Sequence, residues 1–272
     1  MKIIRKAIDF FWIPFNQRAI NNKNTYESAD IIASFSVVDD LFLPESTILD
    51  MLRDKLARMK MLDIGVGGGR TTRNFAPLVK EYFGIDYSKG MIDLCRKKFL
   101  ELSGKFFFEV CDVRNLGIFK DKYFDFILFS FNGLDCISHE DRLVALKEIK
   151  RVCSDGAFFF FSSHNLLSLC NPLNFKACFK LHDLLYKIRN NILIRVVNKD
   201  YRRLTNLKYA IINDGAHNFR LRLYYIKPEE QIRQLENLGF NNIGIYSIFD
   251  GKKVDKDLDK LTDAWLYYLC QA

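Results

Sequence analysis

The chain has 272 residues, of which 49% are hydrophobic, and a formal net charge of +8 at pH 7. This hydrophobic fraction is enough for a real core, which excludes a chain that is disordered throughout. No apolar run approaches the roughly 18 residues of a membrane span, and the seven cysteines are scattered without a CxxC or metal-ligand spacing. We therefore expect a cytoplasmic protein with reduced thiols, no integral membrane segment and no metal.

The N-terminal stretch MKIIRKAIDFFWIPF places basic residues before apolar ones. Asp9 interrupts the apolar run and no small-residue cleavage site follows, which argues against a signal peptide. We interpret this stretch as an amphipathic helix.

From residue 44 onwards, hydrophobic runs of strand length alternate with segments of helical periodicity. Buried strands separated by helices of about ten to fifteen residues are typical of right-handed crossovers and a parallel sheet. The fold class is therefore α/β, with a doubly wound sheet. The expected helices are at 44–59, 70–80, 89–102 and 139–153, and the expected strands are at 60–66, 82–88, 105–113, 124–131 and 156–165.

The alternation breaks after residue 165. Residues 166–208 are basic, apolar and predicted to be helical, with nine Lys or Arg against two Asp, so that the local charge is 9 − 2 = +7. Two period-2 runs within 208–226 flank Asn213, Asp214 and Gly215, a strong signal for a hairpin turn.

The alternation then resumes towards the C-terminus. A helix is expected at 227–240, with Pro228 in its first turn, and a strand at 241–249. The last segment, 264–272, is predicted to be a strand that pairs antiparallel beside 241–249.

Four glycines lie within the five positions 65–69, where the first expected strand ends. A doubly wound sheet binds its ligand beyond the carboxyl ends of its strands, where the first strand turns into the first helix. A dinucleotide fingerprint beginning at Gly65 would need a glycine where the chain has Arg70. The chain instead has Asp63 followed by alternating glycines, Gly65, Gly67 and Gly69.

This pattern resembles motif I of the class I S-adenosylmethionine-dependent methyltransferases. The resemblance implies that the turn lies against the methionine and ribose parts of the cofactor, where a Cβ at Gly65 or Gly67 would collide with it. It also implies that Asp86, at the end of the second strand, accepts both ribose hydroxyls. Asp112 and Val113, after the third strand, would face adenine.

The segment 130–135 matches the part of the family that faces both cofactor and acceptor. The resemblance covers 44–165 and 227–272, and it implies a Rossmann-like, mostly parallel sheet of seven strands whose last strand is antiparallel. Residues 1–43 would form a helical cap region, and 166–226 a basic cap insertion with a helix and a hairpin. The implied cofactor contacts are Asp63, Gly65, Gly67, Gly69, Arg70, Asp86, Tyr87, Met91, Asp112, Val113 and Phe131.

The sequence excludes some methyl acceptors. The segment directly after the fourth strand, 131–134, contains no proline, no proline precedes a cysteine, and the paired-glutamate hairpin of arginine methyltransferases is missing. These absences argue against adenine, cytosine-C5 and arginine methylation, and they favour a small-molecule acceptor.

Two of the four histidines are candidates for the acceptor site. His164, at the carboxyl tip of the fifth strand, is predicted to contact the acceptor or act as its base, and His217, on the expected hairpin, faces the site if the hairpin is a lid. The histidines at 139 and 182 are interpreted as a helix-start residue and a solvated helix residue. The other predicted acceptor contacts are Asn132, Asn165, Arg220, Arg222 and Tyr26.

The favoured function is methylation of oxygen on a small molecule. Resemblance to tailoring enzymes with such caps points to glycan or secondary-metabolite modification, with a sugar hydroxyl and a phosphoryl or phosphoramidate oxygen both open. The basic segment is interpreted first as a solvated face, then as a sign of an anionic acceptor, then as a membrane surface. An RNA methyltransferase and a non-catalytic cofactor-binding protein are the alternatives, and the oligomeric state is open.

Overall fold

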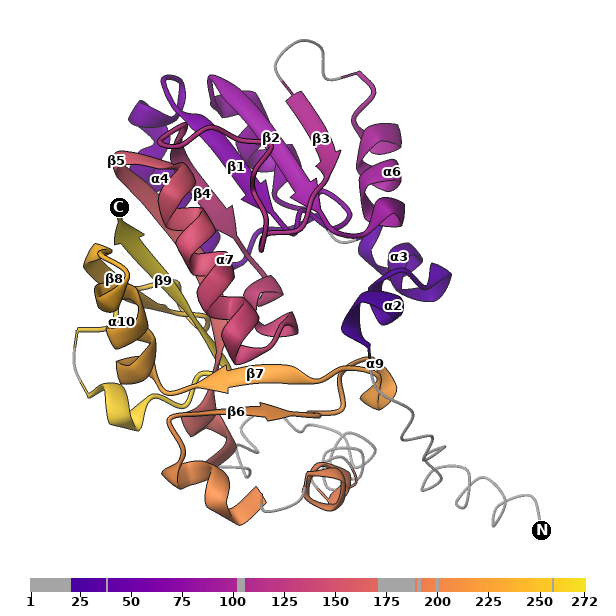
Figure 1. Ribbon diagram of the computed structural model, residues 1–272, viewed down its shortest axis with the longest axis vertical. Coiled ribbons are helices and arrows are strands. Elements are labelled where there is room, and N and C mark those ends of the chain that lie inside the picture. Colours follow the sequence, from indigo (N-terminus) through magenta and orange to yellow (C-terminus); the bar gives the residue numbers. More distant parts are fainter. Residues whose placement is uncertain are drawn as a thin grey trace.

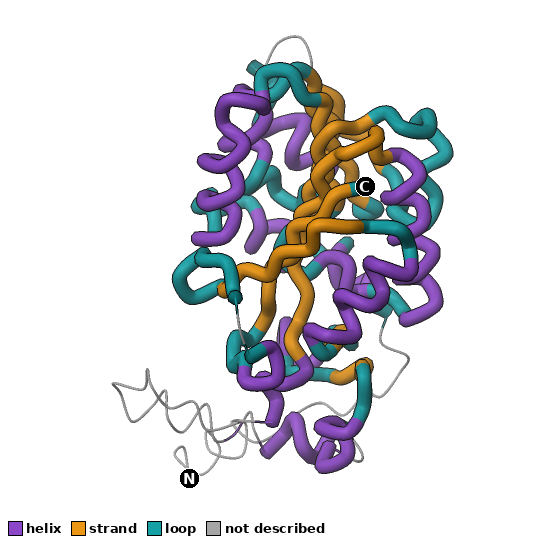
Figure 2. Tube along the Cα trace, turned by 90° about the vertical axis from the view of Figure 1, so that its left-hand side faces the viewer, coloured by secondary structure: helices purple, strands orange, loops and turns teal. Residues whose placement is uncertain are grey.

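A computed structural model describes residues 21–37, 39–101, 106–170, 189, 192–198, 201–255 and 257–272. A twisted sheet runs through the molecule, with helices on both of its faces (Figures 1 and 2). No helix in these described ranges is long and apolar enough to cross a membrane. The α-helices are α2 (Asn22–Tyr26), α3 (Ala29–Phe35), α4 (Leu43–Leu56), α5 (Thr72–Phe75), α6 (Lys89–Lys98), α7 (His139–Val152), α9 (Ala216–Phe219) and α10 (Pro228–Asn237).

The sheet confirms the predicted strands and their order along the chain. Its parallel part has the order β3-β2-β1-β4-β5, and β9 lies between β5 and β8, antiparallel to both. The strands are β1 (Lys60–Ile64), β2 (Glu81–Asp86), β3 (Phe106–Val110), β4 (Phe124–Phe129), β5 (Cys153–Asn165), β6 (Tyr209–Ile212), β7 (Leu223–Ile226), β8 (Asn241–Ser247) and β9 (Trp265–Gln271).

The sheet has nine strands rather than the seven expected. The two additional strands are the hairpin β6–β7, which joins the sheet because β7 pairs in parallel with the last two residues of β5, His164 and Asn165. β5 is thirteen residues long, and its last residues extend beyond the end of β4, where His164 pairs with β9 on one side and with β7 on the other. The seven-stranded core itself is as predicted.

The run of four phenylalanines in β5 shows why its sequence lacks an alternating pattern. Phe159 and Phe161 pack into the hydrophobic cluster on one face of the sheet, whereas Phe160 packs into the cluster on the other. A strand covered on both faces buries every side chain, so a continuous apolar run is favourable there.

Two predicted elements differ from the structure. The helix expected at 70–80 is only α5 followed by a 3-10 turn, Ala76–Leu78, because Pro77 has no N–H to continue α-helical hydrogen bonding. The hairpin turn is also longer than the expected three residues, since β6 ends at Ile212 and β7 begins at Leu223.

The longer connection starts from local side-chain hydrogen bonds. The Asn213 side chain accepts a hydrogen bond from the Gly215 N–H and donates to the Phe219 carbonyl. Asp214 accepts from the Ala216 N–H. These bonds favour the longer turn α9, in which His217, Asn218 and Phe219 have left-handed backbone, over a tight hairpin turn.

Residues 192–197 are also helical. Four further 3-10 turns are η2 (Gly133–Cys136), η3 (Leu166–Cys170), η4 (Tyr201–Asn206) and η5 (Leu258–Lys260).

Candidate active site

The glycine-rich turn joins β1 to α5 in a backbone conformation that favours glycine. Gly65, Gly67 and Gly69 have φ angles of +64°, +54° and +79°, in the left-handed region that residues with a Cβ rarely adopt. The Gly67 N–H donates to Asp86 Oδ2 at 3.0 Å. The turn is therefore fixed to the carboxyl end of β2.

Aromatic side chains surround the same turn. A Cβ added at Gly65 would lie 2.9 Å from the Phe129 ring, and one added at Gly67 would lie 3.2 Å from the ring of Phe35 in α3. In this structure the glycines therefore make room for phenylalanine rings. That they also make room for a cofactor stays a prediction.

Asp86 lies at the tip of β2, 8% exposed. The Gly67 N–H donates to one of its carboxylate oxygens, as described above, and the Ser88 N–H donates to the other, Oδ1, at 2.8 Å. Burial raises the pKa of this carboxyl to about 6, although the two N–H donors lower it. Each carboxylate oxygen has two lone pairs, so each can accept a further hydrogen bond from a ligand.

Asp63 lies inside the protein rather than at the surface of the turn. The hydroxyls of Thr71 and Tyr82 both donate to its Oδ2, Tyr82 at 2.6 Å. Burial raises its pKa to about 6 as well. These bonds tie the end of β1 to the start of α5 and to β2, so Asp63 supports the shape of the turn.

Arg70 is held within the protein by Glu45, a residue that sequence reasoning missed. Its Nη2 donates to Glu45 Oε1 at 2.7 Å, and its Nη1 forms an ion pair with Oε2. Ser130 and Tyr267 also donate hydrogen bonds to this fully buried carboxylate. Contact between Arg70 and a cofactor stays a prediction, and its guanidinium is already paired. The signal for Glu45 was its place at the third residue of a helix, where it accepts from the Phe42 N–H.

The predicted adenine side is formed by residues after β2 and β3. Asp112 accepts two side-chain hydrogen bonds from Arg114, which hold the pKa of Asp112 below its usual value. Val113 is buried, as is Met91 in α6. The Tyr87 ring lies 6.3 Å from that of Tyr26.

The ends of β4 and β5 bring together a buried Asp–His pair. Asp135 Oδ2 accepts hydrogen bonds from the His164 backbone N–H at 2.6 Å and from His164 Nδ1 at 2.8 Å. Since a carboxylate only accepts, Nδ1 carries the proton and Nε2 of a neutral ring is an acceptor. The imidazole also stacks on the Tyr225 ring, with centroids 4.6 Å apart. This geometry suits a base at Nε2.

Arg142 in α7 holds the Asp135 carboxylate of the Asp135–His164 pair. Its guanidinium forms a 2.5 Å ion pair with Asp135 Oδ1 and donates to Ser163 and Gln231, and it lies 4.7 Å from the centroid of the Tyr224 ring. Both Arg142 and Asp135 are fully buried. Sequence reasoning missed Arg142, although the arginine falls on the same buried stripe of α7 as Ala145, Leu146 and Ile149.

Asn132 lies beside the histidine, in a left-handed conformation with φ of +58°. Its Nδ2 is 3.2 Å from His164 Nε2, while its buried Oδ1 has no hydrogen-bond partner. The predicted acceptor contact at Asn165 is less exposed to a ligand, because its fully buried amide donates to the carbonyls of Leu261 and Asp263.

The Phe131 ring is 46% exposed and forms an aromatic surface at the same edge. It lies 5.4 Å from Phe42, 6.2 Å from Phe35 and 6.5 Å from Trp265, measured between ring centroids.

The N-terminal helices and the hairpin connection touch one another over this edge of the sheet, with α9 lying close to α2 and α3 (Figure 1). Arg220 forms an ion pair with Asp30 in α3 at 2.6 Å, and the Tyr26 ring packs edge-on against His217. Arg222 instead contacts α2 through its backbone, which bonds with the Asn22 side chain. His182 lies outside the described residues.

Comparison with known proteins agrees with the fold. Residues 61–156 match the family model described as a methyltransferase domain. The chain contains a class I S-adenosylmethionine-dependent methyltransferase domain. The predicted family, enzyme class and cofactor are thereby confirmed, whereas the comparison tests none of the individual site residues. None of the curated proteins matches the chain.

Solved structures share the fold of this methyltransferase at low sequence identity. A Burkholderia thailandensis N1-methyltransferase, with 1,6-didemethyltoxoflavin and S-adenosylhomocysteine bound, has a TM-score of 0.56 and 14% identity over 91% of this chain and 84% of its own. An N-methyltransferase from Bradyrhizobium japonicum with S-adenosylhomocysteine has a TM-score of 0.55 and 14% identity over 92% and 98%. A putative methyltransferase from Haloferax volcanii, in complex with an activator, has a TM-score of 0.59 and 13% identity over 93% and 97%.

Proposed function

We propose that this methyltransferase methylates a hydroxyl group on a small molecule, and that His164 removes the hydroxyl proton. The observation that carries this proposal is the buried Asp135–His164 pair at the carboxyl edge of the sheet. A hydroxyl is a weak nucleophile that gains from a positioned base.

The residues around the glycine-rich turn suit S-adenosylmethionine. Asp86 retains acceptor positions for ribose hydroxyls, and a buried carboxyl with a raised pKa is stabilised by further donors. Gly65 and Gly67 would lie against the cofactor, and Asp112 and Val113 near its adenine. When bound, the cofactor supplies a methyl group activated by the sulfonium.

The chain's own residues would then orient the acceptor and take its proton. Asp135 holds Nδ1–H of His164, so Nε2 is the atom that would receive the proton, once the acceptor hydroxyl takes the place of the Asn132 amide that donates to it. The Asp135 carboxylate would stabilise the resulting imidazolium. The unpartnered Oδ1 of Asn132 would accept a hydrogen bond from a second hydroxyl of the acceptor.

A sugar or a phosphorylated or phosphoramidate-type glycan precursor has such neighbouring donors, and we propose this acceptor class.

The cap would exclude water from this site. We propose that residues 1–43 and 166–226 form the cap over a core of 44–165 and 227–272, with the Asp30–Arg220 ion pair joining its two parts. The five cysteines whose side chains the structure describes are free thiols, which supports a reducing, cytoplasmic setting.

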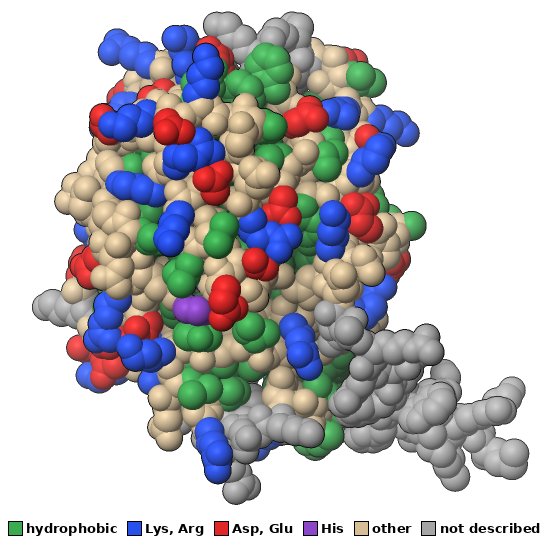
Figure 3. All heavy atoms as spheres, viewed as in Figure 1, with side chains coloured by type: hydrophobic (Ala, Val, Ile, Leu, Met, Phe, Trp, Pro, Cys, Tyr) green, Lys and Arg blue, Asp and Glu red, His purple; other side chains and the backbone are tan. Residues whose placement is uncertain are grey.

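RNA methylation is the rival that the net charge suggests. On the face drawn in Figure 3, Lys and Arg side chains are interspersed with Asp and Glu, and its described residues show no continuous basic track. The distribution on this face favours a small acceptor, and residues 171–188 of the basic segment lie outside the described residues.

Calorimetry and a methyl-release assay test the proposal. S-adenosylmethionine and S-adenosylhomocysteine should bind while NAD does not, and hydroxylated sugars or sugar phosphates should be methylated in preference to amines. Methylation of amines alone would contradict oxygen transfer. RNA binding that falls steeply with salt would instead support the RNA alternative.

A further inference from the structure

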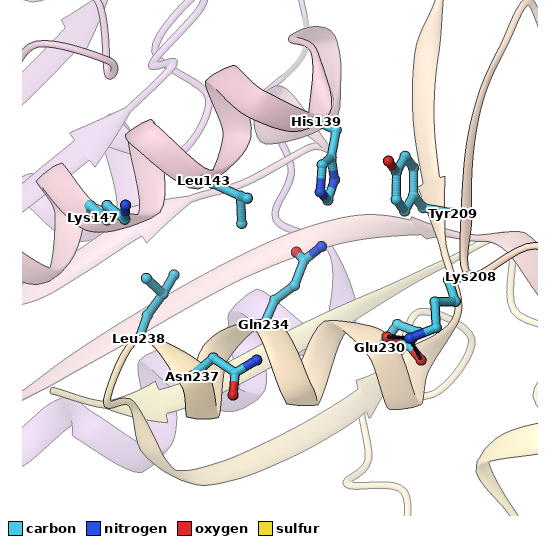
Figure 4. A pocket seen from close by; sticks show the side chains of 9 residues that line it. All are labelled: His139, Leu143, Lys147, Lys208, Tyr209, Glu230, Gln234, Asn237 and Leu238. Carbon is cyan, nitrogen blue, oxygen red and sulfur yellow. Dashed lines mark hydrogen bonds and ion pairs between the residues drawn. The ribbon is translucent and has the colours of Figure 1, made fainter.

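A separate cavity of about 400 Å³ lies between α7 and α10, with the start of β6 as its end wall (Figure 4). Its volume falls in the range of small-molecule sites. None of the residues that line it belongs to the candidate active site. They are His139, Leu143, Lys147, Lys208, Tyr209, Glu230, Gln234, Asn237 and Leu238.

The walls of this cavity suit a flat apolar group. Leu143 in α7 and Leu238, which directly follows α10, line it from opposite sides (Figure 4). The His139 ring lies parallel to the Tyr209 ring, with an interplanar angle of 2° and centroids 4.1 Å apart. Parallel rings and aliphatic side chains together provide a narrow apolar surface on which an aromatic ring can pack.

One polar group in the wall lacks a partner. Gln234 Nε2 donates to the Tyr224 hydroxyl at 3.3 Å, but Gln234 Oε1 is buried and has no hydrogen-bond partner. A buried acceptor without a donor is destabilising. An O–H or N–H group on a ligand would satisfy it.

The charges around the cavity favour an anion. Glu230 is its one carboxylate, and both Lys208 and Arg233 form ion pairs with it. Lys147, exposed on α7, forms no ion pair with any described residue. The cations therefore exceed the carboxylates, and a negative group near Lys147 would be stabilised.

We propose that this cavity is a second ligand site, which binds a small aromatic or heteroaromatic acid bearing an O–H or N–H donor. The ring would pack between Leu143 and Leu238, the donor would reach Gln234 Oε1, and the acid would lie near Lys147. The site is independent of methyl transfer, because its ligand needs neither His164 nor Asp86.

Indole-3-acetate is a suitable probe, since it combines a flat ring, an N–H and a carboxylate. Calorimetric titration of the full chain should show binding that is at least about tenfold weaker for the neutral indole-3-acetamide. Leu143→Trp should fill the cavity and abolish binding. The matched control is Val144→Trp on the next, exposed position of α7, which should bind as the wild type does.

Lys147→Gln tests the charge without threatening the fold, because the side chain is exposed. It should weaken indole-3-acetate binding but leave indole-3-acetamide binding unchanged, whereas Lys97→Gln, an exposed lysine on α6, should change neither. Absence of binding to the wild type, or equal binding to Leu143→Trp and Val144→Trp, would overturn the proposal. Binding lost in His164→Gln but kept in Leu143→Trp would place the probe in the acceptor site and overturn it too.

Discussion

Two regions at the same edge of the sheet hold their carboxylates in different ways. At the ends of β1 and β2, Asp63 and Asp86 are buried with hydroxyl and backbone N–H donors, and burial raises the pKa of each to about 6. At the ends of β4 and β5, Asp135 is buried against Arg142 and His164.

The different partners of these carboxylates determine what each region is able to do. Neutral donors leave a carboxylate able to accept more hydrogen bonds, which suits binding of a neutral ribose. The buried guanidinium of Arg142 instead makes Asp135 part of a fixed charged network. Such a network can fix the tautomer and the orientation of the His164 imidazole. We therefore propose that the first region binds the ribose and that the second region takes the proton.

The largest effect is expected from His164→Gln. It should lower kcat by about 100- to 10,000-fold, the usual contribution of a positioned general base, while the Kd for S-adenosylmethionine stays the same. Single-turnover kinetics and calorimetry would measure the two quantities. A kcat close to that of the wild type would show that the acceptor loses its proton to another group or to water.

Arg142→Leu should break the charged network of the second region. Removing one partner of a buried pair leaves Asp135 uncompensated, at a cost of about 3–5 kcal/mol in the free energy of unfolding. Urea denaturation would measure it. The matched control is Arg53→Leu, which breaks the exposed Arg53–Asp50 pair and should change stability by less than about 1 kcal/mol. Similar effects of the two substitutions would contradict the role given to burial.

Asp63→Asn should change the pH dependence of stability. The folded pKa of Asp63 is about 6 and lies above its unfolded value, so its contribution to stability is present below about pH 4 and is lost as pH rises through about 6. The loss is of order 3 kcal/mol for a shift of about two pKa units.

The neutral variant lacks this loss, so it should gain stability relative to the wild type between about pH 4 and pH 7. Urea denaturation at both values measures the gain. A constant difference between the two proteins would show that Asp63 does not titrate in this range.

Asp86→Ala should weaken S-adenosylmethionine binding by about 1–3 kcal/mol, the range for unpaired groups in a site. The wild type should also bind the cofactor less tightly as pH falls through about 6, because protonation of Asp86 removes an acceptor. Asp86→Asn should lose the part of this dependence that is due to residue 86. Calorimetry across this pH range would detect it, and an unchanged Kd for the alanine variant would place the ribose elsewhere.

The smallest effect is expected at the cap. Arg220→Ala should lower turnover by less than about fivefold, since exposed ion pairs stabilise weakly, and should leave cofactor affinity unchanged. Asp30→Ala should have the same effect because the two residues are partners. Steady-state kinetics would measure turnover in both variants. If Arg220 instead contacts the acceptor directly, only Arg220→Ala would lower turnover.

The sequence by itself determined the core of the sheet and the first region of its edge. Hydrophobic runs such as 156–165 mark strands buried on both faces, and the glycines with Asp63 and Asp86 mark the turn, because these features depend on neighbours along the chain. The antiparallel last strand was also predicted, as the resemblance to the methyltransferase family implies. His164 could be named as a candidate because a strand tip is defined locally, and its contact with the acceptor stays a prediction.

Only the tertiary structure decided the second region. Asp135, Arg142 and Gln231 come from three different elements, and their partnership depends on how α7 and α10 pack on the sheet. The ion pair between Glu45 and Arg70 likewise joins residues that precede and follow β1 in the sequence. The pairing of β5 with both β7 and β9 is another contact between distant segments. Contacts between segments distant in sequence leave no local periodicity or spacing, so no pattern along the chain could have shown them.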